Sequence, residues 1–198
     1  MKIGQLVAQT RTVRRFQQER PVDEAFLHGL IDLARLSGCA RNAQALQFIP
    51  VCAASLCAQI FPHLAWAGYL TDWKGPESGE RPPAYILCLV NEHWHKGPDT
   101  EIYCDVGIAT QSMLLAAAAS GIFGCRIGAF SPALHGQLRL AANHRIVLVV
   151  ALGYPAEEVV LEELRAGGDI RYWRDTAGVH HVPKRPLQDV LLLPSDPA

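Results

Sequence analysis

The sequence has little charge and no long apolar run. Of its 198 residues 19% are charged, and the formal net charge is −1. A balance this close to neutral argues against binding to nucleic acid or to an anionic membrane surface. The longest apolar stretch, around residues 113–119, has the length of a buried helix, so we expect no bilayer-spanning segment. Hydrophobic residues make up 49% of the chain, which excludes disorder and predicts a single domain over residues 1–198.

The six cysteines form no C-x-x-C pair. Cys52, Cys88 and Cys125 lie in apolar, strand-like runs, where cysteine behaves as a small hydrophobic residue. The first nine residues lack the apolar core of a signal peptide, so we expect a reduced, cytoplasmic protein. The histidine pairs at 93/95 and 180/181 have no matching cysteine pair and no partner at helical spacing. We therefore expect no metal site.

The apolar spacing predicts helices and strands that are interspersed without strict βαβ alternation. Helices are expected at residues 3–9, 23–36, 55–64, 101–120 and 132–140, and strands at 48–53, 85–90, 125–130 and 146–152. This order favours a layered α+β domain over a doubly wound fold. The last forty residues are mixed and end on a detached apolar run at 190–193. Such a run needs a surface from another subunit, which predicts an exchange of tails between two chains.

Basic residues gather at the two ends of the chain. Residues 1–20 contain five bases and one acid, and the last third includes the pair Lys184-Arg185. If the segment 11–16 (RTVRRF) is extended, Arg11 and Arg15 lie on one side and Arg14 on the other. Guanidinium and hydroxyl groups in such a segment suit a phosphate or a polarisable carbonyl. A solvated basic edge is the plainer interpretation of the same residues.

Two further segments contain small residues. Residues 38–44 (GCARNAQ) follow a helix, and small residues there would let a planar ligand approach the backbone. The amides of Asn42 and Gln44 could then read its edge, although an ordinary helix-ending loop would look the same. Residues 121–128 (GIFGCRIG) run from helix into strand, which is the wrong order for a dinucleotide-binding glycine loop.

Taken in order, these segments resemble the FMN-dependent nitroreductase family. The family's R-R-S-x-R is similar to residues 10–14 (TRTVR), and its P-S-x-x-N-x-Q-P-W is similar to residues 38–46 (GCARNAQAL). Its Asp-Gly helix and the glycine-cysteine strand after it resemble residues 105–107 and 121–128. Its G-Y-P and its closing basic-Pro-Leu resemble residues 153–155 and 184–187. The resemblance covers nearly the whole chain, from Arg11 to about Val190.

The resemblance implies a nitroreductase-like α+β fold with a central, mostly antiparallel sheet flanked by helices. It also implies a tail-exchanged homodimer with FMN at the interface. Arg11 and Thr12 would hold the phosphate and ribityl chain, and Arg14 would lie at the pyrimidine edge. Either Lys184 or Arg185 would close on the phosphate. The complete set of cofactor-binding residues that the resemblance implies is Arg11, Thr12, Arg14, Gly38, Cys39, Asn42, Gln44, Ile127, Gly128, Ala129, Lys184 and Arg185.

The resemblance also implies NAD(P)H-dependent, ping-pong reduction of nitroaromatic, quinone or similar small-molecule acceptors, with no catalytic side chain because the flavin carries the chemistry. Two segments are candidate substrate lids: residues 66–73 with Tyr69 and Trp73, and residues 91–101 with His93 and Trp94. The alternatives are another flavin reaction of the superfamily, such as reductive dehalogenation, enone reduction or flavin breakdown, and a non-catalytic flavin-binding redox sensor. NADH and NADPH are equally compatible with the sequence.

Overall fold

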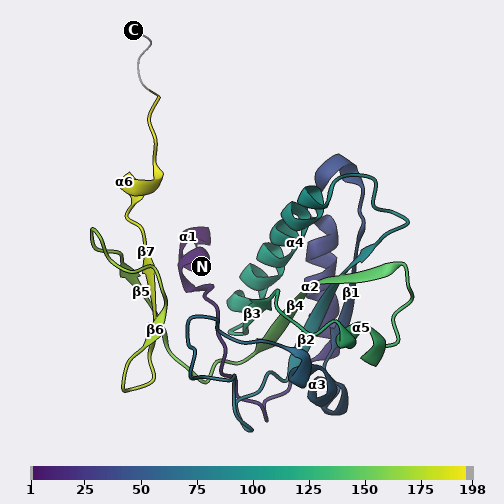
Figure 1. Cartoon of the computed structure of the whole chain (residues 1–198), viewed down its shortest axis with the longest axis horizontal. Helices are drawn as coiled ribbons and strands as arrows, with labels where there is room; N and C mark the ends of the chain where they lie inside the picture. The colour runs from purple at the N-terminus through teal and green to yellow at the C-terminus, as the bar shows by residue number, and fades with distance from the viewer. Residues whose placement is uncertain (1, 195–198) are drawn as a thin grey trace.

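Strand β2 (Ala84–Asn91) lies at the centre of the main sheet, and all eight of its residues are buried. In the computed structural model, which describes residues 2–194, β2 pairs with β1 (Leu46–Val51) on one side and β4 (His144–Gly153) on the other. Strand β3 (Phe123–Ile127) pairs with the far side of β4, which gives the order β1-β2-β4-β3 with every pair antiparallel (Figure 1). The central antiparallel sheet is thus confirmed.

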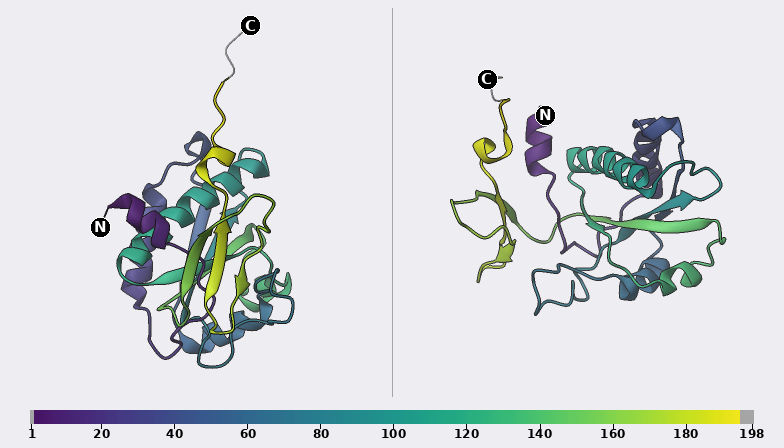
Figure 2. Two further views of the ribbon diagram at one scale, coloured as in Figure 1. Left: turned by 90° about the vertical axis from the view of Figure 1, so that its left-hand side faces the viewer. Right: turned by 45° about the horizontal axis from the view of Figure 1, so that its top comes forward.

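Helices cover both faces of this sheet (Figures 1 and 2). One face carries α2 (Glu24–Leu36) and α4 (Asp99–Ala119), and the other carries α3 (Ala54–Ile60), the 3-10 turn η2 (Phe61–His63) and α5 (Ala133–Gln137). Successive residues of β2 alternate between the two layers, with Tyr85 and Leu87 packed on the α3 side and Ile86 on the α4 side. Two covered faces explain why this strand is apolar throughout.

Helix α4 is long and apolar enough to cross a membrane by length and composition alone. The expectation that no segment reaches that length was therefore wrong. In the structure, however, nine of its residues are buried, and it packs against α2 and the main sheet. Helix α4 is thus the core helix of the layer that covers this face.

The C-terminal part forms a second sheet that the sequence did not predict. Strands β5 (Val159–Glu163) and β7 (His180–Lys184) pair in parallel, and β6 (Trp173–Arg174) adds to β7 antiparallel. This sheet lies beside α1 (Ile3–Gln9) and apart from the main sheet (Figures 1 and 2).

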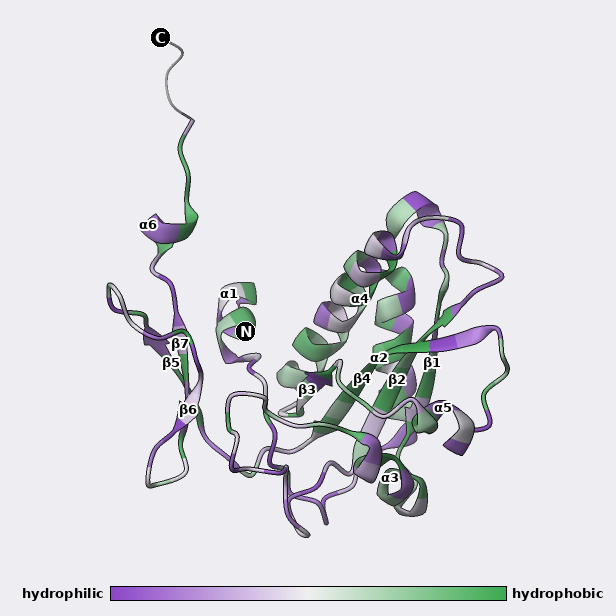
Figure 3. Cartoon of the chain, viewed as in Figure 1, coloured by the Kyte–Doolittle hydropathy of each residue, from purple (hydrophilic) through white to green (hydrophobic). Residues whose placement is uncertain are grey.

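The chain then leaves the body of the molecule. After the short helix α6 (Leu187–Val190), the segment to residue 194 extends outward and is strongly hydrophobic (Figure 3). The side chains of Leu192 and Leu193 are 89% and 81% exposed. The expected detached apolar run is present, and the partner surface that would cover it stays a prediction.

The expected boundaries differ from the observed ones at several ends. Strand β1 begins two residues early and β3 stops at Ile127 instead of residue 130. Helix α5 stops at Gln137 instead of residue 140, and Arg139 just beyond it adopts a positive φ of 51°, which is incompatible with continuing the helix. Asp23 caps α2, accepting a hydrogen bond from the amide of Ala25 at 3.4 Å.

Candidate functional site

The basic segment 11–16 crosses the edge of the main sheet. Thr12 forms a parallel bridge with Gly124 of β3, and the amide of Val13 donates to the Gly124 carbonyl at 3.1 Å. Val13 on one predicted side of the segment, and Arg14 and Phe16 on the other, are all buried. The segment runs between the main sheet and the C-terminal part, so both of its sides are covered.

A buried carboxylate anchors this segment. Oε1 of Glu157 accepts hydrogen bonds from the amides of Arg14 at 2.5 Å and Arg15 at 3.1 Å. Its Oε2 accepts from Nη2 of Arg174 at 2.7 Å, and the Glu157 side chain is only 1% exposed. Glu157 was not predicted from the sequence. A single acidic residue two positions beyond a turn belongs to no motif or periodic pattern that would indicate a functional role.

The guanidinium of Arg14 faces the C-terminal sheet. Its Nη1 lies 3.1 Å from Nε2 of His180, and its Cζ lies 4.5 Å from the centroid of the Tyr172 ring. Burial, reinforced by the charge of Arg14, lowers the pKa of His180 to about 4, so the imidazole is neutral at pH 7. Because arginine only donates, Nε2 accepts and the ring proton is on Nδ1. Sequence reasoning considered His180 only as a metal ligand.

Several buried donors in this region have no acceptor within the described part of the chain: Nε of Arg11, Nε of Arg14 and Nδ1 of His180. Arg11 lines a cavity of about 750 Å³ between α1, the end of α4 and β5, and burial lowers the pKa of its guanidinium. Buried donors without acceptors are the groups that an anionic ligand satisfies. The unpartnered Nε of Arg11, in the wall of this cavity, fits a phosphate-bearing group such as FMN.

The second basic element belongs to the C-terminal part of the chain. Lys184 and Arg185 are exposed at the end of β7. Within residues 2–194, neither side chain takes part in an ion pair. Their predicted closure on a phosphate therefore stays a prediction.

The segment 38–44 lines a separate cavity of about 480 Å³. Of the residues predicted from the sequence, Gly38, Cys39, Gln44 and Trp94 line it, and Asn42 does not. The loop is tied to α4 by the amide of Ala40, which donates to Oδ1 of Asp105 at 2.8 Å. Arg41, Asn42 and Gln44 all have positive φ, between 50° and 55°. Such strained backbone is typical of ligand-binding loops.

Helix α4 separates the two cavities. Asp105 lines the cavity at 38–44 and Ala118 lines the cavity at Arg11. These two residues are thirteen positions apart on one helix, which corresponds to about 20 Å at the rise of an α-helix. In a single chain Arg11 and the predicted residues of the loop 38–44 therefore line different cavities.

The two candidate lid segments lie in different parts of the structure. The ring of Tyr69 lies 4.9 Å from that of Tyr172, and the ring of Trp73 lies 4.2 Å from the guanidinium of Arg174. The segment 66–73 thus packs on the C-terminal sheet beside Arg14, whereas Trp94, after β2, borders the other cavity. His93 lies in the same turn, where its amide donates to Oδ1 of Asn91 at 3.1 Å.

The three residues expected near the flavin ring lie at the end of β3. Ile127 is the last residue of that strand and is buried. Gly128 and Ala129 follow it, and the Ala129 carbonyl accepts from the amide of Ala65 at 2.9 Å. They are therefore adjacent to the first lid segment. Across residues 2–194, no cluster of three His, Cys, Asp or Glu side chains could hold a metal ion.

Comparison with known proteins gives one family match and several structural relatives. The sequence model of the nitroreductase family matches residues 7–154. A candidate nitroreductase from Desulfovibrio desulfuricans, solved in complex with FMN, superposes with a TM-score of 0.69 at 21% identity over 100% of this chain and 99% of that one. A nitroreductase family protein from Clostridium novyi gives 0.63 at 22% identity, over 78% and 86%. A candidate NADH oxidase from Clostridium acetobutylicum gives 0.60 at 20% identity, over 76% and 87%.

Proposed function

Because the chain belongs to the nitroreductase family, we propose that it is an FMN-dependent oxidoreductase that uses NAD(P)H to reduce nitroaromatic, quinone or similar acceptors. The observation that carries this proposal is the set of buried, acceptor-free donors on Arg11, Arg14 and His180. When bound, FMN would supply the group that accepts and returns a hydride in a ping-pong cycle. The complex of one structural relative with FMN supports the same cofactor.

The roles of this chain's residues follow from charge. Arg11 and Thr12 would hold the phosphate and ribityl chain, with Lys184 or Arg185 adding charge from the C-terminal part. Arg14 would lie at the pyrimidine edge of the flavin, where negative charge grows on reduction. A fixed guanidinium there stabilises the reduced anion and so favours hydride acceptance. The segments with Tyr69, Trp73, His93 and Trp94 would select the acceptor.

The functional unit is a homodimer with FMN at the interface. Two features support this part of the proposal. The two cavities lie along different parts of α4, where their nearest lining residues, Ala109 and Ala118, are nine positions or about 14 Å apart, and the apolar tail at 190–193 is exposed. In a dimer the loop 38–44 of one chain would reach the flavin held by the basic segment of the other.

We propose a cytoplasmic location, for which the cysteines are the support. All six are free thiols, as expected in a reducing compartment. Burial raises the pKa of Cys57 and Cys125 to about 11 and that of Cys88 to about 12, so these three are unreactive thiols rather than nucleophiles.

Anaerobic titration tests the function. The purified protein should be yellow with a flavin absorption spectrum, and NADH or NADPH should bleach it. Screening nitroaromatics, quinones, enones and halogenated phenols as re-oxidants then separates the proposed reaction from the other flavin reactions. If flavin is bound but neither nicotinamide bleaches it, the reductase proposal fails and a flavin-binding sensor is left.

A further inference from the structure

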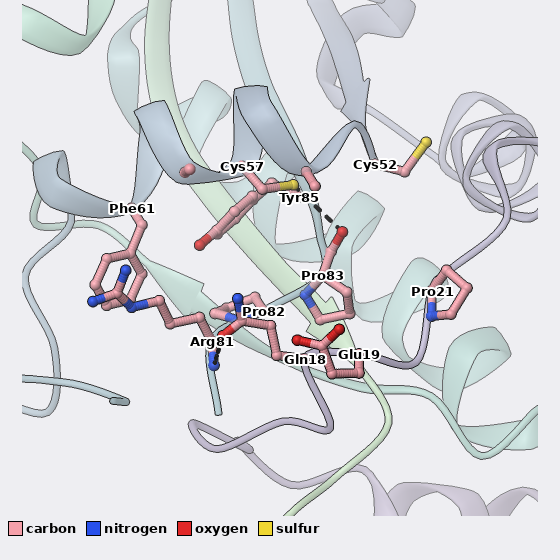
Figure 4. Close-up of a pocket in the computed structure, with 12 residues that line it drawn as sticks. Gln18, Glu19, Pro21, Cys52, Cys57, Phe61, Arg81, Pro82, Pro83 and Tyr85 are labelled. Carbon is pink, nitrogen blue, oxygen red and sulfur yellow. Dashed lines mark hydrogen bonds between the residues drawn. The ribbon is translucent and has the colours of Figure 1, made fainter. Parts of the chain in front are cut away.

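A different cavity lies on the α3 face of the main sheet (Figure 4). It has a volume of about 310 Å³ and lies between the segment 18–21, helix α3 and the turn at 81–83 that leads into β2. Its walls are largely apolar, with Phe61, Pro82 and Pro83 among them. None of the residues predicted to bind FMN or to form a lid belongs to it.

An unpartnered hydroxyl is buried against this cavity. Tyr85 is 0% exposed, and its hydroxyl has no hydrogen-bond partner within residues 2–194. In Figure 4 the hydroxyl points toward Phe61 and Arg81. The thiol of Cys57, which also lines the cavity, donates to the Pro83 carbonyl at 3.4 Å. A buried hydroxyl without a partner costs about 1–3 kcal/mol, which a bound acceptor would offset.

A positive charge lies beside this hydroxyl. The guanidinium of Arg81 stacks on Phe61 at 4.3 Å from the ring centroid, and its Nε is buried without a partner. In the described part of the chain, no carboxylate oxygen lies within 4.0 Å of it. Oε1 of Gln18 fixes the turn by accepting from the amides of Gly79 at 2.8 Å and Arg81 at 3.2 Å. The arginine is therefore held in place and is not neutralised.

We propose that this cavity binds a small aromatic monocarboxylate, whose carboxylate accepts hydrogen bonds from the Tyr85 hydroxyl and the Arg81 guanidinium. The ring would pack on Phe61, Pro82 and Pro83. A volume at the lower end of ligand cavities admits one ring rather than a fused system. A water molecule would satisfy the hydroxyl but would leave the charge of Arg81 unpaired. Glu19, exposed at the rim, disfavours an anion there and so directs the carboxylate inward.

Isothermal titration of the FMN-loaded protein tests this site, with benzoate as the probe and benzamide as its neutral isostere. Benzoate should bind at least tenfold more tightly than benzamide. Tyr85→Phe and Arg81→Gln should each weaken benzoate binding about 10- to 100-fold, the effect of losing one charged hydrogen bond. Tyr103→Phe and Arg139→Gln, two exposed positions outside the cavity, serve as matched controls and should bind as the wild type does.

Tyr85→Phe removes only the unpaired hydroxyl, so this variant should keep or raise the melting temperature and stay informative. The proposal is overturned if benzoate does not bind at millimolar concentration, or binds equally to the Tyr85 and Arg81 variants. Benzoate binding that shifts the flavin absorption and survives both substitutions belongs to the flavin region and equally overturns it. The proposal is supported if benzoate leaves the flavin absorption of the wild type unchanged and fails to bind to both the Tyr85 and the Arg81 variants.

Discussion

Arg14 and His180 are 166 residues apart in the chain, yet Nη1 of Arg14 lies 3.1 Å from Nε2 of His180. The contact joins the basic N-terminal segment to β7. Because the imidazole is neutral, it accepts a hydrogen bond without compensating the charge. A buried carboxylate beside it, that of Glu157, accepts hydrogen bonds from Arg174 and from the backbone amides of Arg14 and Arg15. The cluster thus keeps an excess of positive charge, which suits an anionic cofactor.

Replacing Glu157 by Gln should destabilise the protein by about 3–5 kcal/mol, because Arg174 would be left as a buried charge without its partner. Urea denaturation measures this. Asp169→Asn breaks the exposed pair with Arg171 and should change stability little. Equal effects of the two substitutions would show that Glu157 does not anchor the segment.

His180 should make stability fall on acidification. Its folded pKa of about 4 lies below the unfolded value of about 6.5, so the unfolded chain binds more protons between these two pH values. The contribution is complete above pH 6.5 and is lost as the pH falls toward 4, on the order of 2 kcal/mol. The urea concentration at the unfolding midpoint should therefore change less between pH 4 and pH 7 in His180→Gln than in the wild type.

The neighbouring His181 titrates in the opposite sense. Burial lowers its pKa, but hydrogen bonds to Glu162 and Asp175 outweigh burial and leave the pKa raised. Its contribution is therefore present below the unfolded pKa and lost as the pH rises through the folded one. His181 is present in both the wild type and His180→Gln, so its contribution cancels when the pH dependence of their stabilities is compared. Parallel curves for wild type and His180→Gln would contradict the assignment to His180.

Arg14→Ala should weaken FMN binding about 10- to 100-fold and lower the flavin reduction potential, because the reduced anion loses its counter-charge. Arg14→Lys should recover part of the potential. Arg20→Ala, which removes a guanidinium stacked on Tyr154, is the control. Spectroelectrochemical titration reports the potential, and an unchanged value in Arg14→Ala would show that Arg14 does not face the pyrimidine edge.

Gly124→Ala should destabilise the fold by about 1–3 kcal/mol. An added Cβ would lie 2.5 Å from the Ala151 carbonyl and 2.9 Å from Leu114 Cδ2, and its displacement would disturb the bridge to Thr12. Gly29→Ala, inside α2 with no atom within 4 Å of the added Cβ, should instead stabilise the protein by about 0.5–1 kcal/mol. Thermal denaturation should show shifts of opposite sign, and shifts of the same sign would contradict the steric explanation.

Replacing Leu191, Leu192 and Leu193 together by Asp should convert a dimer into monomers, because the exposed apolar tail would no longer bury against a second chain. Sedimentation velocity measures the change. Ile170→Asp, which alters an exposed apolar residue outside the tail, should remain dimeric. A triple variant that sediments as the wild type does would remove the tail from the interface.

The main sheet and its helices could be predicted because their sequences are strongly patterned. The run YILCLV at 85–90 is apolar on both faces, and MLLAAAA at 113–119 has no polar side, so each is compatible only with a buried element. The C-terminal sheet escaped prediction because β6 has two residues and β7 reads HHVPK. Its pairing is a tertiary effect with no local signal.

Some residues of the candidate site could be predicted from the sequence, and others could not. Arg11, Arg14 and the loop 38–44 were found because they form short motifs with recognisable order. Glu157, Arg174 and His180 were not found as site residues, since their roles come from contacts across up to 166 residues of chain. Charge pairing between distant segments leaves no periodicity in the sequence.

Helix α4 also restricts which changes of length the chain tolerates. Adding or removing one residue between Asp105 and Ala118 would turn these two cavity-lining residues relative to each other by about 100° and shift them by about 1.5 Å. Substitutions on the exposed side of this stretch leave both quantities unchanged. The number of residues in this stretch therefore sets the orientation of Asp105, which holds the loop 38–44, relative to Ala118, which lines the cavity at Arg11.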